Sequence, residues 1–435
     1  MTRRVVVIGG GAAGMSAASA ARRTDPTLDV VVLEATGNVA YGLCGLPYYL
    51  GGVVGAAEEL FAYPPDHFTR ARGIDVRYHA RAGELDPIGR WVTYRQEGRT
   101  RRLSYSSLVV TSGAAPALLA LPGLDDTRVF TIRTLEDAVA LRSLLDAGRI
   151  GRAVVVGAGY IGLEMAEALW ERGCAVTVVE LLDRVLPNLD RELAATVEAH
   201  VREHVDLRLG TAAAAACDPP PDLVVLSVGV RPAATAVAAA GARTGPAGAL
   251  LVDERMRTSL DDVWAAGDCA APLHRVTGSP AYVPLGTTAN KTGRVAGTVA
   301  AGGDATFEGI VGTAVVKVFD LEVARTGLTL DEARAAGLEA EATDVVHRSR
   351  AKYYPGGGPL HVRLVHGVGG RLLGAQLIGS EGAAHRVDVV AAALHAGMTI
   401  GDLGRLDLAY APPYAPVYDP LLIAAQAAER KLVPA

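Results

Sequence analysis

The stretch that decides the fold is RRVVVIGGGAAGMSAASAARR, at residues 3–23. A run of apolar residues ends in a cluster of glycines, and an alanine-rich segment follows. This order predicts a buried strand, a tight turn and a helix. Gly9, Gly11 and Gly14 have the spacing G-x-G-x-x-G, in which the second glycine lets the backbone approach a pyrophosphate and the third lets helix and strand pack closely. Because a helix N-terminus presents unpaired N–H groups to phosphates, the turn is predicted to bind a dinucleotide.

An acidic residue completes this first pattern. The next predicted strand, DVVVLE at residues 29–34, ends in Glu34. In dinucleotide sites of this kind, an acid about 20 residues beyond the turn bonds a ribose hydroxyl. Strand, turn, helix and acid therefore occur in the order that the chemistry needs.

The same pattern returns later in the chain. RAVVVGAGYIGLEMAEAL, at residues 152–169, supplies Gly157, Gly159 and Gly162, and the strand AVTVVE then ends in Glu180. A single G-x-G-x-x-G is weak evidence, but here each copy has its own strand, helix and acid. Two dinucleotide sites in one chain predict electron transfer between a flavin at the first site and a nicotinamide at the second.

The choice of nicotinamide depends on charges near the second acid. Glu180 favours NADH, because a carboxylate bonds a free 2′-hydroxyl and repels a 2′-phosphate. Arg184 lies four residues later and is able to reach such a phosphate. The sequence therefore favours NADH and leaves NADPH open.

The composition excludes several classes of protein. The chain has 435 residues, half of them hydrophobic, which predicts two to four globular domains. A formal net charge of −5 argues against general binding to nucleic acids or anionic membranes. No apolar run approaches the roughly 20 residues of a membrane span, and Gly9–Gly11 interrupt the N-terminal run that otherwise resembles a signal peptide.

The four cysteines are scattered along the chain. They are Cys44, Cys174, Cys217 and Cys269, without a CxxC pair or a zinc-ligand spacing, so no metal site is predicted. This usage predicts a protein of the reducing cytoplasm rather than a disulfide scaffold. Cys44 differs from the others, because it lies among glycines in YGLCGLPYYL and precedes Pro47, which suits the first turn of a helix. We expect that helix to lower the pKa of the Cys44 thiol.

With these motifs in place, the chain resembles the pyridine nucleotide–disulfide oxidoreductases over its whole length. TSLDDVWAAGD, at 258–268, resembles the family's second flavin motif, which places Asp268 beside the ribityl and pyrophosphate part of FAD. LVVTSGAAP with Gly113 and VVLSVGVRP with Gly229 resemble the two crossings between the FAD and NAD(P)H domains. The segment 285–297 resembles the start of a helix beside the isoalloxazine.

The resemblance implies an α/β architecture with two Rossmann-like domains and a C-terminal α+β dimerisation domain. The predicted boundaries are 1–113 and 243–312 for the FAD domain, 114–242 for the NAD(P)H domain and 313–435 for the dimerisation domain. The proline- and alanine-rich stretch 211–222 is expected to be a loose connection. The implied cofactor-binding residues are Gly9, Gly11, Ala12, Gly14, Glu34, Gly113, Gly157, Gly159, Tyr160, Ile161, Gly162, Glu180, Gly229, Asp268 and Ala289.

The surroundings of Cys44 indicate the branch of the family. Many members carry two redox cysteines four residues apart, but here Ala40 and Tyr48 occupy the positions four residues before and after Cys44. The cysteine must therefore exchange with a partner outside the chain. CGLPYY resembles the single-cysteine branch of coenzyme A disulfide reductases, NADH oxidases, peroxidases and persulfide reductases. Ala12 stands where the oxidases and peroxidases have a histidine, which favours thiol exchange over peroxide cleavage.

The C-terminal region favours the coenzyme A disulfide reductases. YAPPYAPVYDP, at 410–420, resembles a segment whose tyrosines reach the active cysteine from the partner subunit of a homodimer. On this basis the catalytic residues are Cys44, Tyr354 and Tyr414. Tyr353 is the alternative to Tyr354, and Tyr410 and Tyr418 are alternatives to Tyr414. Packing at the dimer interface is the other explanation for these tyrosines.

Coenzyme A also needs cations for its phosphates. The resemblance assigns this role to Arg22, Arg70 and Arg72, with Asn290 as a further contact, although arginines at these positions are also typical of a solvated surface. Gly42 departs from the branch, which often has asparagine there. The function predicted from the sequence is an FAD-dependent NAD(P)H:CoA-disulfide reductase. NADH oxidase or peroxidase and CoA-persulfide or polysulfide reductase are the alternative enzymes, and a flavoprotein electron carrier or redox sensor is the alternative of a different functional class.

Overall fold

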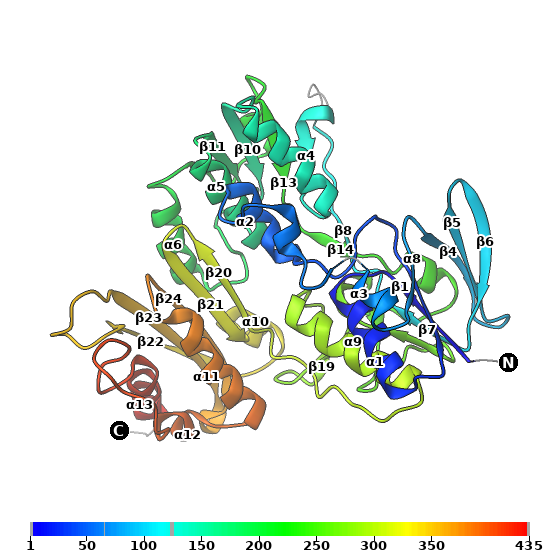
Figure 1. Ribbon diagram of the computed structural model, residues 1–435. Coiled ribbons are helices and arrows are strands. Elements are labelled where there is room, and N and C mark those ends of the chain that lie inside the picture. The colour runs from blue at the N-terminus through cyan, green and yellow to red at the C-terminus, as the bar shows by residue number, and fades with distance from the viewer. Residues whose placement is uncertain (1–2, 65, 122–125, 433–435) are drawn as a thin grey trace.

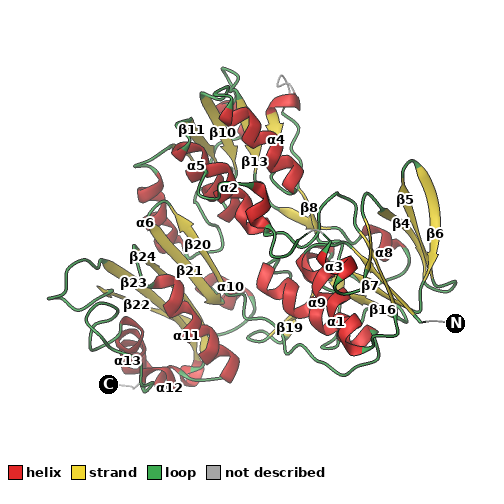
Figure 2. Ribbon diagram, in the orientation of Figure 1, coloured by secondary structure: helices red, strands yellow, loops and turns green. Residues whose placement is uncertain are grey.

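The computed structural model describes residues 3–64, 66–121 and 126–432. The chain forms three bodies, each built around its own sheet (Figure 1). The N-terminal body lies on the right of the view, the second at the top, and the C-terminal body, yellow to red, at the lower left. Helices flank all three sheets (Figure 2). The predicted α/β class is confirmed, and the domain boundaries stay a prediction.

The first sheet contains β1, the strand predicted from the first glycine-rich motif. Its five strands are all parallel, in the order β16-β7-β1-β2-β3. Val5, Val6 and Val7 of β1 are all buried, because neighbouring elements cover both faces of the sheet, and this explains a continuous apolar run without alternation. The elements are β1 (Arg4–Ile8), α1 (Ala12–Thr24), β2 (Asp29–Leu33), α3 (His67–Arg70), β3 (Asp75–Arg77), β7 (Ser107–Val110), β16 (Val263–Ala265), η5 (Gly267–Cys269) and α9 (Gly286–Ala300).

Two helices of this body, α1 and α9, pack at very short range. A Cβ atom at Gly293 would overlap the backbone of Ala13, and one at Gly297 would overlap the backbone of Ala17. Glycines on one helix therefore let it lie against the alanines of the other. This contact brings a segment near residue 290 against the first glycine-rich turn.

The second body repeats the architecture of the first. Its sheet has five parallel strands in the order β12-β11-β10-β13-β9. The elements are η3 (Asp126–Arg128), β9 (Val129–Phe130), α4 (Leu135–Asp146), β10 (Arg152–Val156), α5 (Tyr160–Glu171), β11 (Ala175–Val179), α6 (Arg191–Val201), β12 (Asp206–Arg208), α7 (Ala213–Ala216) and β13 (Leu223–Leu226). The expectation of a loose connection over 211–222 is wrong in part, because α7 forms there from four consecutive alanines, which favour helix.

The two bodies are joined by a short antiparallel ribbon. Its strands are β8 (Ala114–Pro116) and β14 (Val230–Pro232), so the outward and return crossings pair with each other. A segment of the first body also reaches the second: α2 (Leu46–Gly51) packs against α5, as the blue helix at the top of Figure 1 shows. The Cys44 segment thus lies between the two bodies.

The C-terminal body is an antiparallel sheet with helices packed on it. The strand order is β20-β21-β24-β23-β22. The alternating apolar runs noted in the sequence form β20 and β24, and the helical stretch forms α11, as predicted. The elements are β20 (Ala314–Val318), β21 (Leu321–Gly327), α10 (Leu330–Ala335), β22 (Ala340–Arg348), β23 (Pro359–Gly367), η6 (Val368–Gly370), β24 (Leu372–Gly379), α11 (Ala383–Ala396), α12 (Ile400–Gly404) and α13 (Pro420–Leu432).

The remaining elements belong to the first body but lie outside its five-stranded sheet. They include a three-stranded antiparallel sheet of β4 (Arg81–Asp86), β5 (Trp91–Gln96) and β6 (Arg99–Ser104). The others are η1 (Leu43–Gly45), η2 (Ala57–Leu60), α8 (Thr235–Ala239), η4 (Pro246–Gly248), β15 (Leu250–Leu251), β17 (Ala270–Ala271), β18 (Leu273–His274) and β19 (Ser279–Pro280). Within the described ranges, no helix has the length and apolar character needed to cross a bilayer.

Candidate active site

The first glycine-rich turn has the shape that its sequence predicts. Gly9 has a φ of +95°, and a Cβ there would overlap the carbonyl oxygen of Thr111. A Cβ at Gly14 would overlap the carbonyl oxygen of Gly9. Gly11 precedes α1, and a Cβ there would meet nothing within 4 Å. Gly9 and Gly14 therefore have to be glycines, because a side chain there would overlap the backbone. Gly11 borders open space of the kind that a pyrophosphate needs.

Glu34 holds this turn from the end of β2. Its Oε2 accepts a hydrogen bond from the backbone N–H of Gly10 at 2.7 Å. Its Oε1 accepts from the N–H and the hydroxyl of Thr36 at 2.7 and 2.8 Å. Since a carboxylate oxygen has two lone pairs, Oε2 is able to accept one more donor, which fits the predicted contact to a ribose hydroxyl.

The second turn reproduces these contacts. Gly157 has a φ of +103°, and its Cβ would overlap the carbonyl oxygen of Ser227. A Cβ at Gly162 would overlap the Gly157 carbonyl, whereas one at Gly159 would meet nothing within 4 Å. Glu180 accepts hydrogen bonds from the N–H groups of residues 158 and 182, at 2.8 and 2.9 Å. The protein therefore contains the same glycine-rich turn with its acid twice, at residues 9–14 with Glu34 and at residues 157–162 with Glu180. We call these the first and the second cradle, and both fit a dinucleotide.

Two predicted cofactor contacts begin α5. The Ile161 side chain is exposed. The Tyr160 hydroxyl accepts a hydrogen bond from the side-chain amide of Asn188 at 2.7 Å, and burial raises the pKa of this tyrosine. Both residues follow Gly159, whose Cβ would meet open space, and their contact with the dinucleotide stays a prediction.

Asp268 lies in η5 and is linked through Arg133 to the ribbon between the two bodies, since the Arg133 Nε donates to the Ala114 carbonyl oxygen of β8 at 3.0 Å. Its carboxylate forms an ion pair with Arg133 at 3.0 Å. Gly113 has a φ of +68°, and a Cβ there would lie 3.4 Å from the Arg133 guanidinium. Gly229 also has a positive φ, of +94°, and precedes β14. Arg133 was not singled out in the sequence, because no motif surrounds it and its partner lies 135 residues away.

The predicted contacts on α9 face α1. Ala289 is buried. The side-chain oxygen of Asn290 accepts a hydrogen bond from the Ser16 hydroxyl at 2.8 Å. The segment 285–297 thus begins a helix against the first cradle, and Ala12, the first residue of α1, is exposed beside it.

Cys44 lies in η1, two residues before α2, with Pro47 as the second residue of that helix. Its side chain is exposed, although protein groups surround it. The expectation of a lowered thiol pKa is wrong, because the protein groups around Cys44 raise its pKa on balance. Burial raises the pKa of Cys44, and the carboxylates of Glu164 and Asp268 raise it further, while Arg133 lowers it.

Two residues beside Cys44 were missed as candidates. Glu164 lies on α5, and its carboxyl group and the Tyr48 phenol influence each other's pKa. Burial raises the pKa of Glu164 to about 7, and burial also raises the pKa of Tyr48 to about 12. Tyr48 carried a weak signal, because it follows Cys44 by four residues in a region already singled out. No feature of the sequence places Glu164 there.

The predicted coenzyme A arginines cluster at the end of α1. The Arg22 guanidinium donates to the backbone carbonyls of Pro26, Leu28 and Gly73, at 2.6 to 2.8 Å. Arg72 donates to the buried Ser19 hydroxyl at 2.5 Å and lies over the rings of Tyr63 and Phe68. Arg70 is exposed and pairs with Asp66 at 3.0 Å. Of these three, Arg22 is the one whose two terminal NH₂ groups donate to backbone carbonyls.

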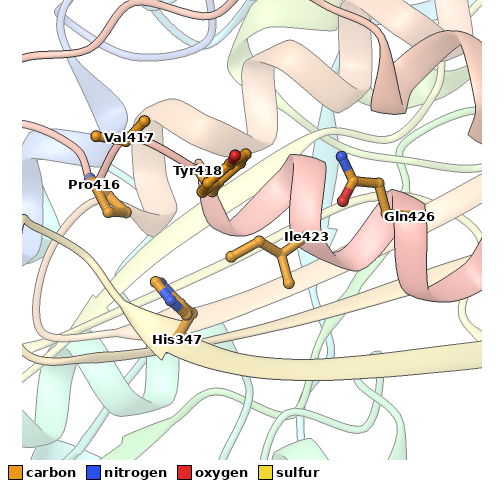
Figure 3. Close-up of a pocket in the computed structure, with 6 residues that line it drawn as sticks. All are labelled: His347, Pro416, Val417, Tyr418, Ile423 and Gln426. Carbon is orange, nitrogen blue, oxygen red and sulfur yellow. The ribbon is translucent and has the colours of Figure 1, made fainter.

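The C-terminal tyrosines gather on the outer part of the third body. The hydroxyls of Tyr353 and Tyr410 are hydrogen-bonded at 2.8 Å, and Tyr354, Tyr414 and Tyr418 are exposed. Figure 1 shows the β22–β23 loop, the segment of Tyr353 and Tyr354, at the left edge of the C-terminal body, whereas α2 lies with the second body. A pocket beside them is lined by His347, Pro416, Val417, Tyr418, Ile423 and Gln426 (Figure 3).

Comparison with known proteins identifies the family. The sequence model described as pyridine nucleotide-disulphide oxidoreductase matches residues 3–293, and that of the family's dimerisation domain matches residues 313–420. The chain belongs to the pyridine nucleotide-disulphide oxidoreductase family. It is therefore an oxidoreductase that depends on FAD and a nicotinamide dinucleotide, as predicted.

Three relatives show where in the family its similarities lie. The chain is 39% identical to an NAD(P)H sulfur oxidoreductase (CoA-dependent) of Pyrococcus abyssi, over 93% of each chain. It is 29% identical to a coenzyme A disulfide reductase of Staphylococcus aureus, over 91% of this chain and 92% of that one. The crystal structure of reduced Bacillus anthracis CoADR-RHD superposes with a TM-score of 0.95 at 32% identity, and the match covers 99% of this chain and 81% of that one.

Glu180→Gln is expected to weaken the preference for NADH. The substitution removes the negative charge that would repel a 2′-phosphate, so the ratio of kcat/KM for NADPH to that for NADH should rise about tenfold, equivalent to roughly 1.4 kcal/mol. Asp183→Asn is the matched control, because Asp183 is an exposed acid in the same loop that pairs with Arg191. An unchanged ratio in the Gln variant would remove Glu180 from nicotinamide selection.

Proposed function

We propose that the protein is an NAD(P)H-dependent reductase of small-molecule disulfides, with Cys44 as its redox group and coenzyme A disulfide as its substrate. The observation that carries this proposal is the isolation of Cys44. All four cysteines are free, Cys174 and Cys269 are buried, and Cys44 is the exposed one. Since the chain offers it no second sulfur, the partner sulfur has to arrive with the substrate.

The proposed reaction uses Cys44 as a nucleophile and an electron acceptor. The bound flavin and nicotinamide supply the two electrons that break a disulfide formed at this sulfur. The Cys44 thiolate attacks one sulfur of coenzyme A disulfide, a mixed disulfide forms, and one coenzyme A leaves as a thiolate that takes up a proton. Reduction of the mixed disulfide then releases the second coenzyme A and restores the Cys44 thiolate.

The arginine cluster at the end of α1 supports binding of a phosphorylated substrate. Arg70 is exposed, and Arg72 is held by Ser19 with its guanidinium face against two rings. Such a fixed guanidinium suits bidentate recognition of a phosphate. In this proposal Arg22 contributes its charge and orders the backbone around Gly73, while Asn290 contributes a polar contact from α9.

The proposed dimer completes the site. Tyr354 and Tyr414 carry exposed phenols within the residues that the dimerisation-domain model matches. We place these two tyrosines of one subunit beside Cys44 of the other, where each phenol donates a hydrogen bond to the leaving thiolate.

Tyr354→Phe and Tyr414→Phe test this placement. Each is expected to lower kcat/KM for coenzyme A disulfide by about 10- to 100-fold, because a hydrogen bond made to developing charge is lost. The rate of flavin reduction by NADH, measured by stopped flow, should not change. Tyr105→Phe is the control, since it removes a buried hydroxyl from the first body. Equal kcat/KM values in all four enzymes would refute the role of the tyrosines.

Reduction of a coenzyme A persulfide or polysulfide is the second candidate. It is favoured by the 39% identity to the CoA-dependent sulfur oxidoreductase of P. abyssi. The Cys44 thiolate would attack the outer sulfur of coenzyme A persulfide, the S–S bond would break, and coenzyme A would leave as a thiolate. Two electrons from the bound cofactors would then release the transferred sulfur from Cys44 as hydrosulfide. Ala12 offers no acid–base group for the peroxide alternative.

One set of assays separates these substrates. Purified holoenzyme is reduced with NADH or NADPH and mixed with coenzyme A disulfide, coenzyme A persulfide, peroxide or oxygen, with nicotinamide oxidation as the readout. Fastest turnover of the disulfide supports the proposal, and fastest turnover of the persulfide supports the second candidate. Fast turnover of peroxide or oxygen with neither sulfur substrate consumed would refute both.

A further inference from the structure

The helix that follows Cys44 is buried in the second body rather than in the first. Leu46, Tyr49 and Leu50 of α2 belong to the hydrophobic cluster that also contains Leu141 of α4 and Leu169 of α5. Among the described residues, the two hydrophobic clusters of the first body contain no residue of α2. The segment that carries the exchange cysteine is therefore packed into the body that contains the second cradle, where Figure 1 shows α2 beside α4 and α5.

The contact between α2 and α5 leaves no room for a side chain. A Cβ at Gly51 would lie 3.3 Å from the Cα of Ala168 and 3.1 Å from a carboxylate oxygen of Glu171, so the end of α2 lies directly against α5. The helix α5 also begins at the second cradle, with Gly159 as its N-cap. The same helix thus borders the dinucleotide turn with its first residues and supports the Cys44 segment with its last.

Arg142 of α4 holds the end of α2 as well. One of its NH₂ groups donates a hydrogen bond to the carbonyl oxygen of Tyr49, and its guanidinium lies over the Tyr49 ring, 5.1 Å from the ring centre. A helix leaves its last four carbonyl groups without partners inside the helix, and an arginine side chain is able to supply the missing donor. Arg142 therefore caps α2 from a helix of another body.

Two charged residues fix the Arg142 guanidinium in this place. The Asp146 carboxylate, one turn later on α4, accepts hydrogen bonds from the Arg142 Nε at 2.9 and 3.0 Å. The same carboxylate pairs with Arg172, which follows α5, and a Cβ at Gly52 would lie 3.5 Å from the Arg172 guanidinium. The Arg142 side chain is only 16% exposed, so it has lost most of its water and depends on these protein acceptors.

We propose that Arg142 is a positioning residue for Cys44, and that through it the place of the exchange sulfur is set by the second body, although the flavin cradle belongs to the first. The link from α2 back to the sulfur is short and bonded. The Gly45 N–H donates to the Gly42 carbonyl at 2.9 Å, and the Gly42 N–H donates to the Leu60 carbonyl at 2.8 Å. A shift of α2 is therefore passed on to Cys44.

The proposal rests on the proposed function, because it concerns the sulfur that exchanges with the substrate. That sulfur has to lie within reach of the electrons that arrive at the first cradle, and it has to face the incoming S–S bond in line. Such steps are sensitive to position, since a misplacement of about 1 Å costs on the order of 100-fold in rate. A loosened α2 should therefore slow the sulfur steps and leave the nicotinamide step alone.

Arg142→Met tests this role, because methionine replaces the apolar stem of arginine without donating a hydrogen bond. Holoenzyme is reduced with NADH, mixed without oxygen with coenzyme A disulfide or coenzyme A persulfide, and followed by stopped-flow absorbance of the flavin. The rate of flavin reoxidation should fall about tenfold. The rate of flavin reduction by NADH and the KM for the sulfur substrate should stay natural, because the hydrogen bonds of Arg142 go to Tyr49 and Asp146.

Two further variants separate positioning from general damage. Arg202→Met is the matched control, because Arg202 also pairs with an acid on its helix, Glu198, at 2.9 Å and donates to a backbone carbonyl of the second body, that of Leu207, at 2.7 Å. All its rates should be natural. Arg142→Lys keeps one cationic donor but loses the planar fork that reaches Tyr49 and Asp146 together, so its loss should be smaller than that of Arg142→Met.

Hydrogen exchange gives a readout that does not depend on turnover. The N–H groups of Gly52, Val53 and Val54 donate to the carbonyls of Tyr48 and Tyr49 at 2.9 to 3.3 Å, so they report whether the end of α2 is closed. Their exchange should be about tenfold faster in Arg142→Met than in the natural protein, whereas that of α5 should be unchanged.

Natural reoxidation in Arg142→Met would overturn the proposal, whether or not exchange at residues 52–54 is faster. An equal loss in Arg202→Met, or a loss of flavin reduction in proportion to that of reoxidation, would overturn it too, because either would show a general defect of the second body. Failure of the proposed function is a different result, since it appears as disulfide turnover that survives in Cys44→Ser.

Discussion

The Cys44→Ser enzyme is expected to be reduced by NADH at the natural rate and to lose turnover of coenzyme A disulfide by about 10³-fold or more. Serine has nearly the same shape as cysteine, and residue 44 is exposed, so the fold should not change. An alkoxide is not a redox partner for a disulfide, and no other exposed cysteine stands beside the ribbon between the first two bodies. The measurement combines stopped-flow absorbance of the flavin with steady-state oxidation of NADH.

Cys217→Ser is the matched control for that experiment. Cys217 is half-buried and lies in the segment after α7, within the second body. Its replacement should leave both rates unchanged. Disulfide turnover that survives in Cys44→Ser would show that the electrons leave the enzyme by another route.

Gly162→Ala is expected to disable the second cradle while sparing the first. The added Cβ would overlap the carbonyl oxygen of Gly157, so either the turn or the start of α5 has to move. A displacement of about 1 Å in a positioning element costs about 100-fold in rate, and we expect flavin reduction by NADH to fall by that factor. Reduction by dithionite and the FAD content should stay natural, because the first cradle lies in another sheet.

The comparison variant is Gly159→Ala, whose Cβ would meet no protein atom within 4 Å. Its thermal stability should therefore equal that of the natural protein, whereas Gly162→Ala should unfold at a lower temperature. If Gly159→Ala nevertheless raises the KM for NADH, the open space at this glycine is the place where the dinucleotide backbone passes. Natural kinetics in Gly162→Ala would contradict the assignment of this turn.

Local patterns predicted the elements that depend on the backbone alone. The run from Arg3 to Arg23 became a strand, a turn and a helix, and its copy near residue 157 did the same. Pro47 correctly indicated a helix after Cys44. The stretch 211–222 was the exception, since its prolines suggested a loop while its alanines formed α7.

The prediction that depended on electrostatics, a lowered pKa for Cys44, was wrong. The sequence indicated a helix N-terminus, which stabilises a thiolate, but gave no sign of the acids that surround the sulfur. Glu164 and Asp268 come from segments more than 100 residues away, and their effect depends on burial. Arg22 is a similar case, because its guanidinium is engaged by carbonyls that include that of Gly73.

The sequence by itself determined the two cradles, their acids and the solitary exchange cysteine. These features are short and contiguous, and their spacing is set by the geometry of one strand, one turn and one helix. Only the tertiary structure decided that Glu164 influences the pKa values of Tyr48 and Cys44, and that Arg133 pairs with Asp268. These relations join distant segments, so they depend on which faces pack together and how much water that packing removes.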